Sequence, residues 1–259
     1  MATVFEVITE EFLDDAEAIQ NIVAILEEAK GTAKARVAAA NSATLLLAAT
    51  FEEFVRQMAK EYAKYAVSKA GTVEKLPSKM ISIAWKRTMD GLAKMKLAQE
   101  SSGDARKNTF TEAQVKFSVI HDFCKGDLSQ NIYDQLIHNE NNMRPGEINS
   151  LFKVSGLSDI CKKLSEKNEI LLFTGETERD KAHGKVQSFI EDFFERRNGI
   201  AHALNNGSSS SPQRISTDLE FFNAFSKAMR TTLDEVTAPP ANTPELEAET
   251  VEEIITEAN

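Results

Sequence analysis

Apolar residues recur at steps of three and four along most of the chain, which is the period of one face of an α-helix. The longest such pattern ends at Gly71 and predicts a helix with an apolar face over about seven turns. Its apolar positions are Ala40, Ala43, Leu47, Phe51, Phe54, Met58, Tyr62 and Tyr65. The same spacing over 10–30, 78–97, 177–198 and 212–236 predicts further long helices. The expected fold class is therefore all-α.

Segments rich in Asn, Ser, Gly or Pro separate these helices and predict loops. The expected loops cover residues 99–108, 139–146 and 205–211. Shorter helices are expected within 111–138, 147–154 and 158–165. The run 170–173 is too short to assign, because its apolar residues fit a buried strand and a helical turn equally well.

The end of the chain differs from the rest in composition. Residues 238–259 hold six acidic residues, three prolines and no basic residue, and this composition predicts a flexible acidic tail. The formal net charge is −10 for the whole chain and −4 without this tail, which excludes a uniformly basic surface but leaves room for a local basic site. We expect an N-terminal helix over 1–34 packed on a helical domain over 35–237, followed by the tail.

The sequence offers little support for a metal site or a membrane segment. Two cysteines, Cys124 and Cys161, are too few for a disulfide framework or a four-cysteine zinc site. His121 lies three residues before Cys124, but no second pair of ligands accompanies them. No apolar run reaches 18 residues, and the first 14 residues lack the basic and apolar regions of a signal peptide. A cytoplasmic protein without a metal or cofactor is expected.

Candidate chemistry gathers near the end of the helix predicted over 177–198. At 100° per residue, Val186, Ile190, Phe193 and Arg197 fall within one narrow stripe. An arginine on an apolar face needs a carboxylate, a phosphate or a subunit boundary to satisfy its five donors. Arg196 lies on the flank of the stripe, where water reaches it more easily.

His202 follows Arg197 by five residues, which on a regular helix places the two about 140° apart. A break at Gly199 would allow both side chains to turn toward one target. Asn198 then adds an amide that orients a ligand or the imidazole, and the trio suits phosphodiester chemistry. A purely structural interpretation stays open and is favoured by spacing alone, because a cation and an Asn-Gly pair commonly end helices.

The run from Arg196 to His202 resembles the signature of the HEPN superfamily, and its form Arg-Asn-x-Ile-Ala-His is similar to that of the RiboL-PSP-type group. Residues 45–65 resemble the first long core helix of that group, and residues 142–147 with 157–160 resemble its middle segment. The similarity covers residues 35–235. It implies an all-helical bundle that forms a homodimer, with two copies of the signature at the subunit boundary. Active members resemble metal-independent endoribonucleases.

Carried over by this resemblance, the catalytic residues are Arg197, Asn198 and His202, and Arg196 is an RNA-binding residue. The implied partners are RNA, a second copy through the face that carries Arg197, and an antitoxin or another defence-system protein. Leu204 stands where some toxin members have a tyrosine that a partner nucleotidyltransferase modifies, so that route of regulation is not expected.

Two other interpretations stay open beside a ribonuclease of a defence or toxin system. Some HEPN domains are non-catalytic, so the chain is alternatively a helical dimer that binds RNA or protein. The third interpretation is a scaffold whose acidic tail is the point of contact.

Overall fold

The structure, a computed structural model, describes residues 2–28, 32–95, 103–138, 141–202 and 210–239. All regular secondary structure within these ranges is helical, which confirms the predicted all-α fold class. In chain order the helices are α1 Val4–Glu28, α2 Ala33–Ala70, the 3₁₀ turn η1 Val73–Lys75, α3 Met80–Lys94, α4 Gly103–Cys124, α5 Tyr133–Leu136, α6 Pro145–Lys153, α7 Ile160–Ser165, α8 Asn168–Thr174, α9 Arg179–His202 and α10 Pro212–Thr237.

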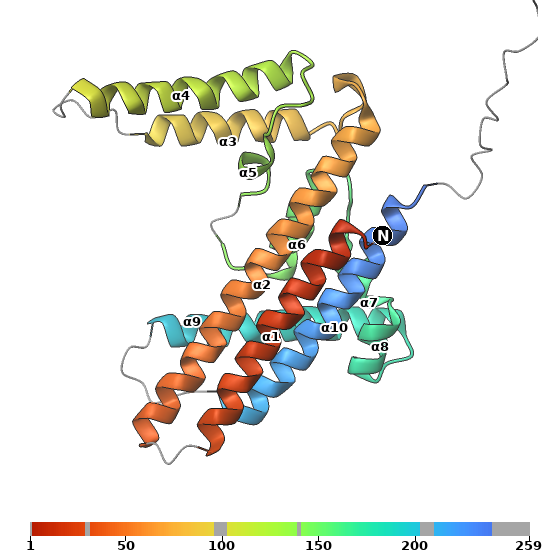
Figure 1. Ribbon diagram of the computed structural model, residues 1–259. Helices are drawn as coiled ribbons and strands as arrows, with labels where there is room; N and C mark the ends of the chain where they lie inside the picture. Colours follow the sequence, from red (N-terminus) through yellow and green to blue (C-terminus); the bar gives the residue numbers. More distant parts are fainter. Residues whose placement is uncertain (1, 29–31, 96–102, 139–140, 203–209, 240–259) are drawn as a thin grey trace, which may run out of the picture.

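Three long helices form the main bundle. Figure 1 shows α1, α2 and α10 side by side, with α1 packed against both of the others and α9 passing across them. Phe12 of α1 contacts Phe54 of α2, with ring centroids 4.8 Å apart. The N-terminal helix is therefore part of the packed structure, and it begins at Val4 rather than near residue 10.

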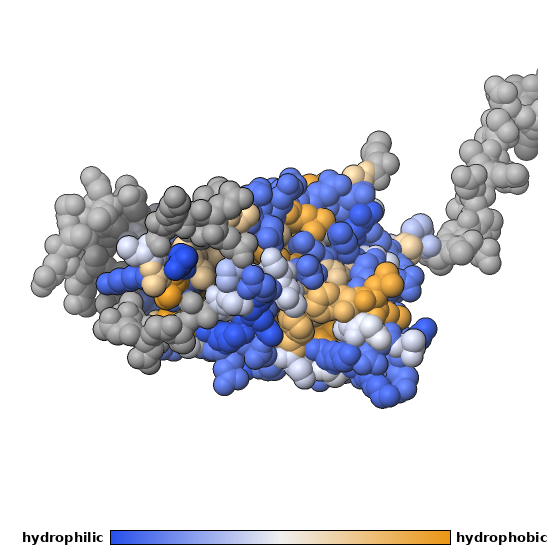
Figure 2. All heavy atoms as spheres, turned by 90° about the horizontal axis from the view of Figure 1, so that it is seen from below, coloured by the Kyte–Doolittle hydropathy of each residue, from blue (hydrophilic) through white to orange (hydrophobic). Residues whose placement is uncertain are grey.

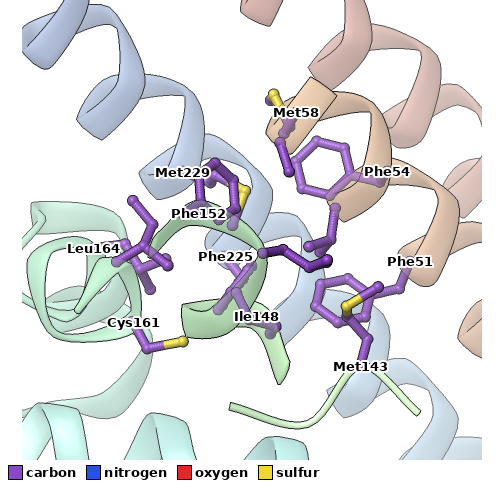
Figure 3. Close-up of a cluster of buried hydrophobic side chains, with 14 of the residues drawn as sticks. Phe51, Phe54, Met58, Met143, Ile148, Phe152, Cys161, Leu164, Phe225 and Met229 are labelled. Atoms are coloured by element: carbon purple, nitrogen blue, oxygen red, sulfur yellow. The ribbon is translucent and has the colours of Figure 1, made fainter. Parts of the chain in front are cut away.

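The core of the bundle is rich in phenylalanine. Phe51 of α2 lies at its centre, with ring centroids 4.3 Å from Phe222, 5.3 Å from Phe225 and 6.3 Å from Phe194. Offset and edge-to-face ring pairs of this kind add stability beyond the area they bury. Figure 3 shows the neighbouring part of the core, where side chains of α2, α6, α7 and α10 meet. The apolar stripe that predicted α2 is therefore the stripe that the fold buries.

The helix ends follow local sequence signals. Gly71 adopts a φ of 67° after α2, a left-handed conformation that glycine enters without steric cost. Ser211 caps α10 by accepting a hydrogen bond from the Arg214 amide, and Pro212 occupies the first turn as expected. These signals fix the ends of the two longest core helices.

Helices α3 and α4 form a hairpin that projects to one side of the bundle (Figure 1). Its base is anchored by Met80, Ala84 and Phe123, all fully buried. Arg87 adds a side-chain hydrogen bond to the Leu136 carbonyl oxygen, which ties α3 to the end of α5.

Two local predictions change. The loop expected over 99–108 is helical from Gly103 onward, because α4 starts there. The unassigned run 170–173 lies inside the helix α8, where Ile170 is fully buried. A run this short carries no periodic signal, so tertiary packing decides its structure.

The face of the molecule that Figure 2 shows is mostly hydrophilic, with apolar side chains gathered in a few patches. Among the described residues, the large apolar side chains that stay exposed are Val4, Val7, Ile22, Leu45, Leu46, Trp85, Phe110, Val115, Phe117 and Leu172. Beyond residue 239, the predicted acidic tail lies outside the described residues.

Candidate functional site

The candidate site lies on the last turns of α9. This helix continues without a break through Gly199 to His202, so the expected interruption at Gly199 is wrong. Glycine permits a departure from helical geometry but does not compel one, and its cost inside a helix is only about 1 kcal/mol. On the continuous helix, the Cα–Cβ directions of Arg197 and His202 differ by about 140°.

Arg197 extends the buried stripe of α9, as the sequence predicted. Val186, Ile190 and Phe193 of that stripe are fully buried. The Nε atom of Arg197 is itself buried and has no hydrogen-bond partner among the described residues. Leaving a charged donor buried and unpaired costs free energy, unless a ligand or a second subunit completes it. Arg197 is therefore the group at this end of α9 that most needs an external partner.

Asn198 connects Arg197 to the neighbouring loop. Its Oδ1 atom accepts a hydrogen bond of 2.8 Å from Asn142 Nδ2 and one of 3.3 Å from Arg197 Nη1. Because Asn198 and His202 are four residues apart, they lie one turn apart on the same face. The Arg197 guanidinium thus bends toward the face that carries the exposed His202, even though its Cβ points away.

The segment before α6 runs along that same face of α9. Glu191, Asn198 and His202 fall within about 40° of one another around the helix. Asn142 binds Asn198, and Arg144 forms an ion pair with Glu191. Met143, between them, is fully buried near Phe51 (Figure 3), so the core holds this segment in place.

Arg196 is bound on the opposite side by α10. Its two terminal nitrogens donate to the Asp218 carboxylate at 2.9 and 2.8 Å, and Nη1 also donates to Ser210 Oγ at 3.1 Å. Its Nε donates to Asp192 at 3.3 Å. All three nitrogens of the guanidinium therefore have protein partners, and the group also lies 5.5 Å from the Phe193 ring centroid.

Asp218 is the buried acid of this cluster, with only 1% of its surface exposed. Burial raises the pKa of the Asp218 carboxyl, while the hydrogen bond from Arg196 and the charges of Arg196 and Arg214 lower it. Arg214 also pairs with Asp192, which closes a network of two acids and two arginines. A buried carboxylate held by a bidentate arginine is a strong local constraint on how α9 meets α10.

The structure thus brings Arg197, Asn198 and His202 to one end of one helix, and it places Arg196 in a separate, satisfied cluster. Sequence reasoning did not identify Asn142, which holds Asn198, or Asp218, which holds Arg196. A signal for Asp218 was present, because an acid at position 218 interrupts the apolar stripe formed by Ile215, Leu219 and Phe222.

Other candidates from the sequence find ordinary local partners. His121 Nδ1 lies 3.0 Å from the Asp122 carboxylate. Burial raises the pKa of Cys161 to about 12, so its thiol stays protonated at neutral pH. Across the described ranges, no three or more His, Cys, Asp or Glu side chains are grouped so as to hold a metal ion.

Fold and site together define an all-α protein with an Arg–Asn–His set at the end of a core helix. A family model described as RiboL-PSP-HEPN matches residues 10–235, which is most of the chain, and the protein belongs to this family. The match includes most of α1, upstream of the boundary expected at residue 35. No curated protein and no solved structure matches the chain significantly.

None of the described helices is long and apolar enough to span a membrane. Membership in this family favours a nuclease or another RNA-related function.

Proposed function

We propose that this protein is a metal-independent endoribonuclease whose site is formed by Arg197, Asn198 and His202. The observation that carries the proposal is the buried and unpartnered Nε of Arg197 beside Asn198, one turn from the exposed His202. A guanidinium matches the charge and geometry of a phosphodiester, and a histidine supplies or removes a proton near neutral pH.

The chemistry proposed is attack of the RNA 2′-hydroxyl oxygen on the adjacent phosphorus. The O2′–P bond forms while the P–O5′ bond breaks, a base takes the 2′-hydroxyl proton, and an acid protonates the leaving 5′-oxygen. Arg197 stabilises the charge that builds on the phosphoryl oxygens, and Asn198 positions the guanidinium or the phosphate. The products are a 2′,3′-cyclic phosphate and a 5′-hydroxyl.

A homodimer supplies the second imidazole that this reaction uses. The proposed interface is the face that carries Arg197, so that two copies of the site meet across a two-fold axis. In this arrangement one His202 acts as the base and the other as the acid.

The test is cleavage of a defined single-stranded RNA by the full chain in excess EDTA, followed by end-group analysis. Loss of general acid–base catalysis typically costs ~10²–10⁴-fold, so His202→Ala is expected to be almost inactive. His183→Ala is the matched control, because it removes a histidine from the other end of α9. Circular dichroism establishes that both variants are folded.

Three outcomes would contradict the proposal. The first is cleavage that EDTA abolishes. The second is cleavage that persists undiminished in His202→Ala, and the third is cleavage that falls equally in both histidine variants. Absence of cleavage by the folded wild type would instead favour the alternative function, a non-catalytic helical dimer that binds RNA or protein.

The proposed biological setting is a defence or toxin system that acts on cytoplasmic RNA, with an antitoxin or a related protein as regulator. Expression of an active ribonuclease of this kind is expected to arrest cell growth. His202→Ala, expressed to the same level, is expected to be harmless. Equal growth arrest by the wild type and His202→Ala would show that toxicity does not depend on the proposed RNA cleavage.

A further inference from the structure

The projecting α3–α4 hairpin carries aromatic side chains on its surface. Trp85 is 38% exposed, Phe117 is 42% exposed and Phe110 is 61% exposed. Trp85 meets Phe117 edge to face, with centroids 6.2 Å apart, and Phe117 stacks on His121 at 5.7 Å. We call these four residues the aromatic strip. Exposed rings grouped in this way are uncommon on a surface without a binding role.

The strip presents its rings along one line. Phe110, Phe117 and His121 fall within about 40° of one another around α4. Seven residues separate the two phenylalanines, which places them about 10 Å apart along the helix axis. Trp85 of α3 lies beside Phe117, and the buried base of the hairpin holds both helices in place. Separate rings are therefore presented at intervals to an elongated ligand.

The same hairpin is basic in an otherwise acidic protein. From Met80 to Cys124 the hairpin contains seven Lys or Arg and five Asp or Glu, a net charge of +2 within a chain of −10. The remaining residues together carry −12. Lys86, next to Trp85, is exposed to solvent. Aromatic rings among basic residues form the combination that binds single-stranded nucleic acid, since bases stack on the rings and the cations attract the phosphates.

We propose that the aromatic strip binds single-stranded RNA, as a binding surface additional to the site at the end of α9. The proposal rests on the proposed function in that the same RNA is the substrate. Pairing of two such hairpins is less favourable, because their like net charges would repel each other. The phosphates of RNA would be attracted by the net positive charge of the hairpin and repelled by the net negative charge of the rest of the chain.

The test is binding of a fluorescein-labelled 20-nucleotide single-stranded RNA to His202→Ala protein, measured by fluorescence anisotropy. The His202→Ala background prevents cleavage during the measurement. Stacking on one ring is worth ~1–3 kcal/mol by alanine substitution, so adding Phe117→Ala is expected to weaken binding at least about fivefold. Adding Phe110→Ala as well is expected to weaken it further.

Two matched variants separate ring stacking from other effects. Val115→Ala removes an exposed apolar side chain from another face of α4 and is expected to leave affinity unchanged. Lys86→Ala is expected to lower affinity and to reduce the slope of log affinity against log salt by about 0.7. Circular dichroism and light scattering establish the fold and mass of each variant.

The outcomes distinguish this inference from the proposed function. Unchanged RNA affinity in the Phe110→Ala, Phe117→Ala double variant overturns the proposal that the aromatic strip binds RNA, whether or not the wild type cleaves RNA. A fall in molecular mass in that variant with unchanged affinity also overturns it and assigns the strip to self-association. If binding depends on the rings but the wild type does not cleave RNA, RNA binding by the aromatic strip is supported. Only the proposed ribonuclease function is then contradicted.

Discussion

Two neighbouring arginines at the end of α9 have opposite surroundings. Arg196 faces α10, and each nitrogen of its guanidinium is hydrogen-bonded to Asp218, Ser210 or Asp192. Arg197 bonds only the adjacent Asn198 among the described residues, and its Nε is buried without a partner. The Arg196 guanidinium is thus fully hydrogen-bonded within the protein, whereas the Arg197 guanidinium is only partly hydrogen-bonded among the described residues.

The difference favours a stabilising role for Arg196 and is consistent with the functional role that we propose for Arg197. An arginine whose donors are all hydrogen-bonded holds packed elements together and has few donors available to a phosphate. An incompletely paired arginine carries a desolvation cost, which a bound ligand would offset. The geometry therefore favours a structural role for Arg196. Its predicted contact with RNA stays a prediction, and the last experiment below bears on it.

Arg196→Ala is expected to give the largest effect on stability. It leaves the buried Asp218 carboxylate with only Arg214 as a counter-charge, and breaking a buried ion pair costs about 3 kcal/mol. The free energy of unfolding is measured by urea denaturation. Arg179→Ala is the matched control, because that side chain is 69% exposed and its ion pair with Glu166 contributes little.

A second substitution sharpens this result. Asp218→Asn removes the buried charge, so in the Arg196→Ala background it is expected to recover part of the lost stability. If Arg196→Ala unfolds at the same urea concentration as Arg179→Ala, the network is not a source of stability and the comparison fails.

Asn142→Ala is expected to have a smaller effect, and on activity rather than on stability. It removes the 2.8 Å hydrogen bond that holds Asn198 beside Arg197. One such bond contributes ~1 kcal/mol, which corresponds to a loss of about five- to tenfold in cleavage rate if Asn198 positions the reacting groups. An unchanged cleavage rate would show that Asn198 needs no support from this loop.

Truncation after Thr237 is expected to have the smallest effect. The removed residues 238–259 contain three prolines and a net charge of −6, and offer little to bury. The melting temperature, followed by circular dichroism, is expected to stay nearly unchanged. A fall of several degrees would show that these residues pack on the helical domain.

Much of the fold was accessible from the sequence, because three-four periodicity directly reports a buried helical face. Leu47, Phe51 and Met58 were predicted on one stripe of a long helix and are fully buried in α2. The helical residues 103–108 and the helix α8 were missed, since the first segment is polar and the second is short. In both places a periodic signal is absent.

The candidate site was only partly accessible. Arg197 was identified because it continues an apolar stripe, a property of local spacing. Asn142 lies 56 residues from its partner Asn198, and no local pattern encodes a hydrogen bond over that distance. The helical path through Gly199 was also misjudged, because a glycine fits both a helix interior and a helix end.

The most direct test of the central claim compares Arg196→Lys with Arg197→Lys in RNA cleavage in excess EDTA, at a temperature where circular dichroism shows both variants folded. An ammonium cannot reproduce the planar fork of a guanidinium. The account predicts a loss of ~10²–10³-fold for Arg197→Lys, as for removal of a donor that stabilises transition-state charge. It predicts a rate close to the wild type for Arg196→Lys. Equal losses in the two variants, or a greater loss in Arg196→Lys, would contradict the division of roles between these two arginines.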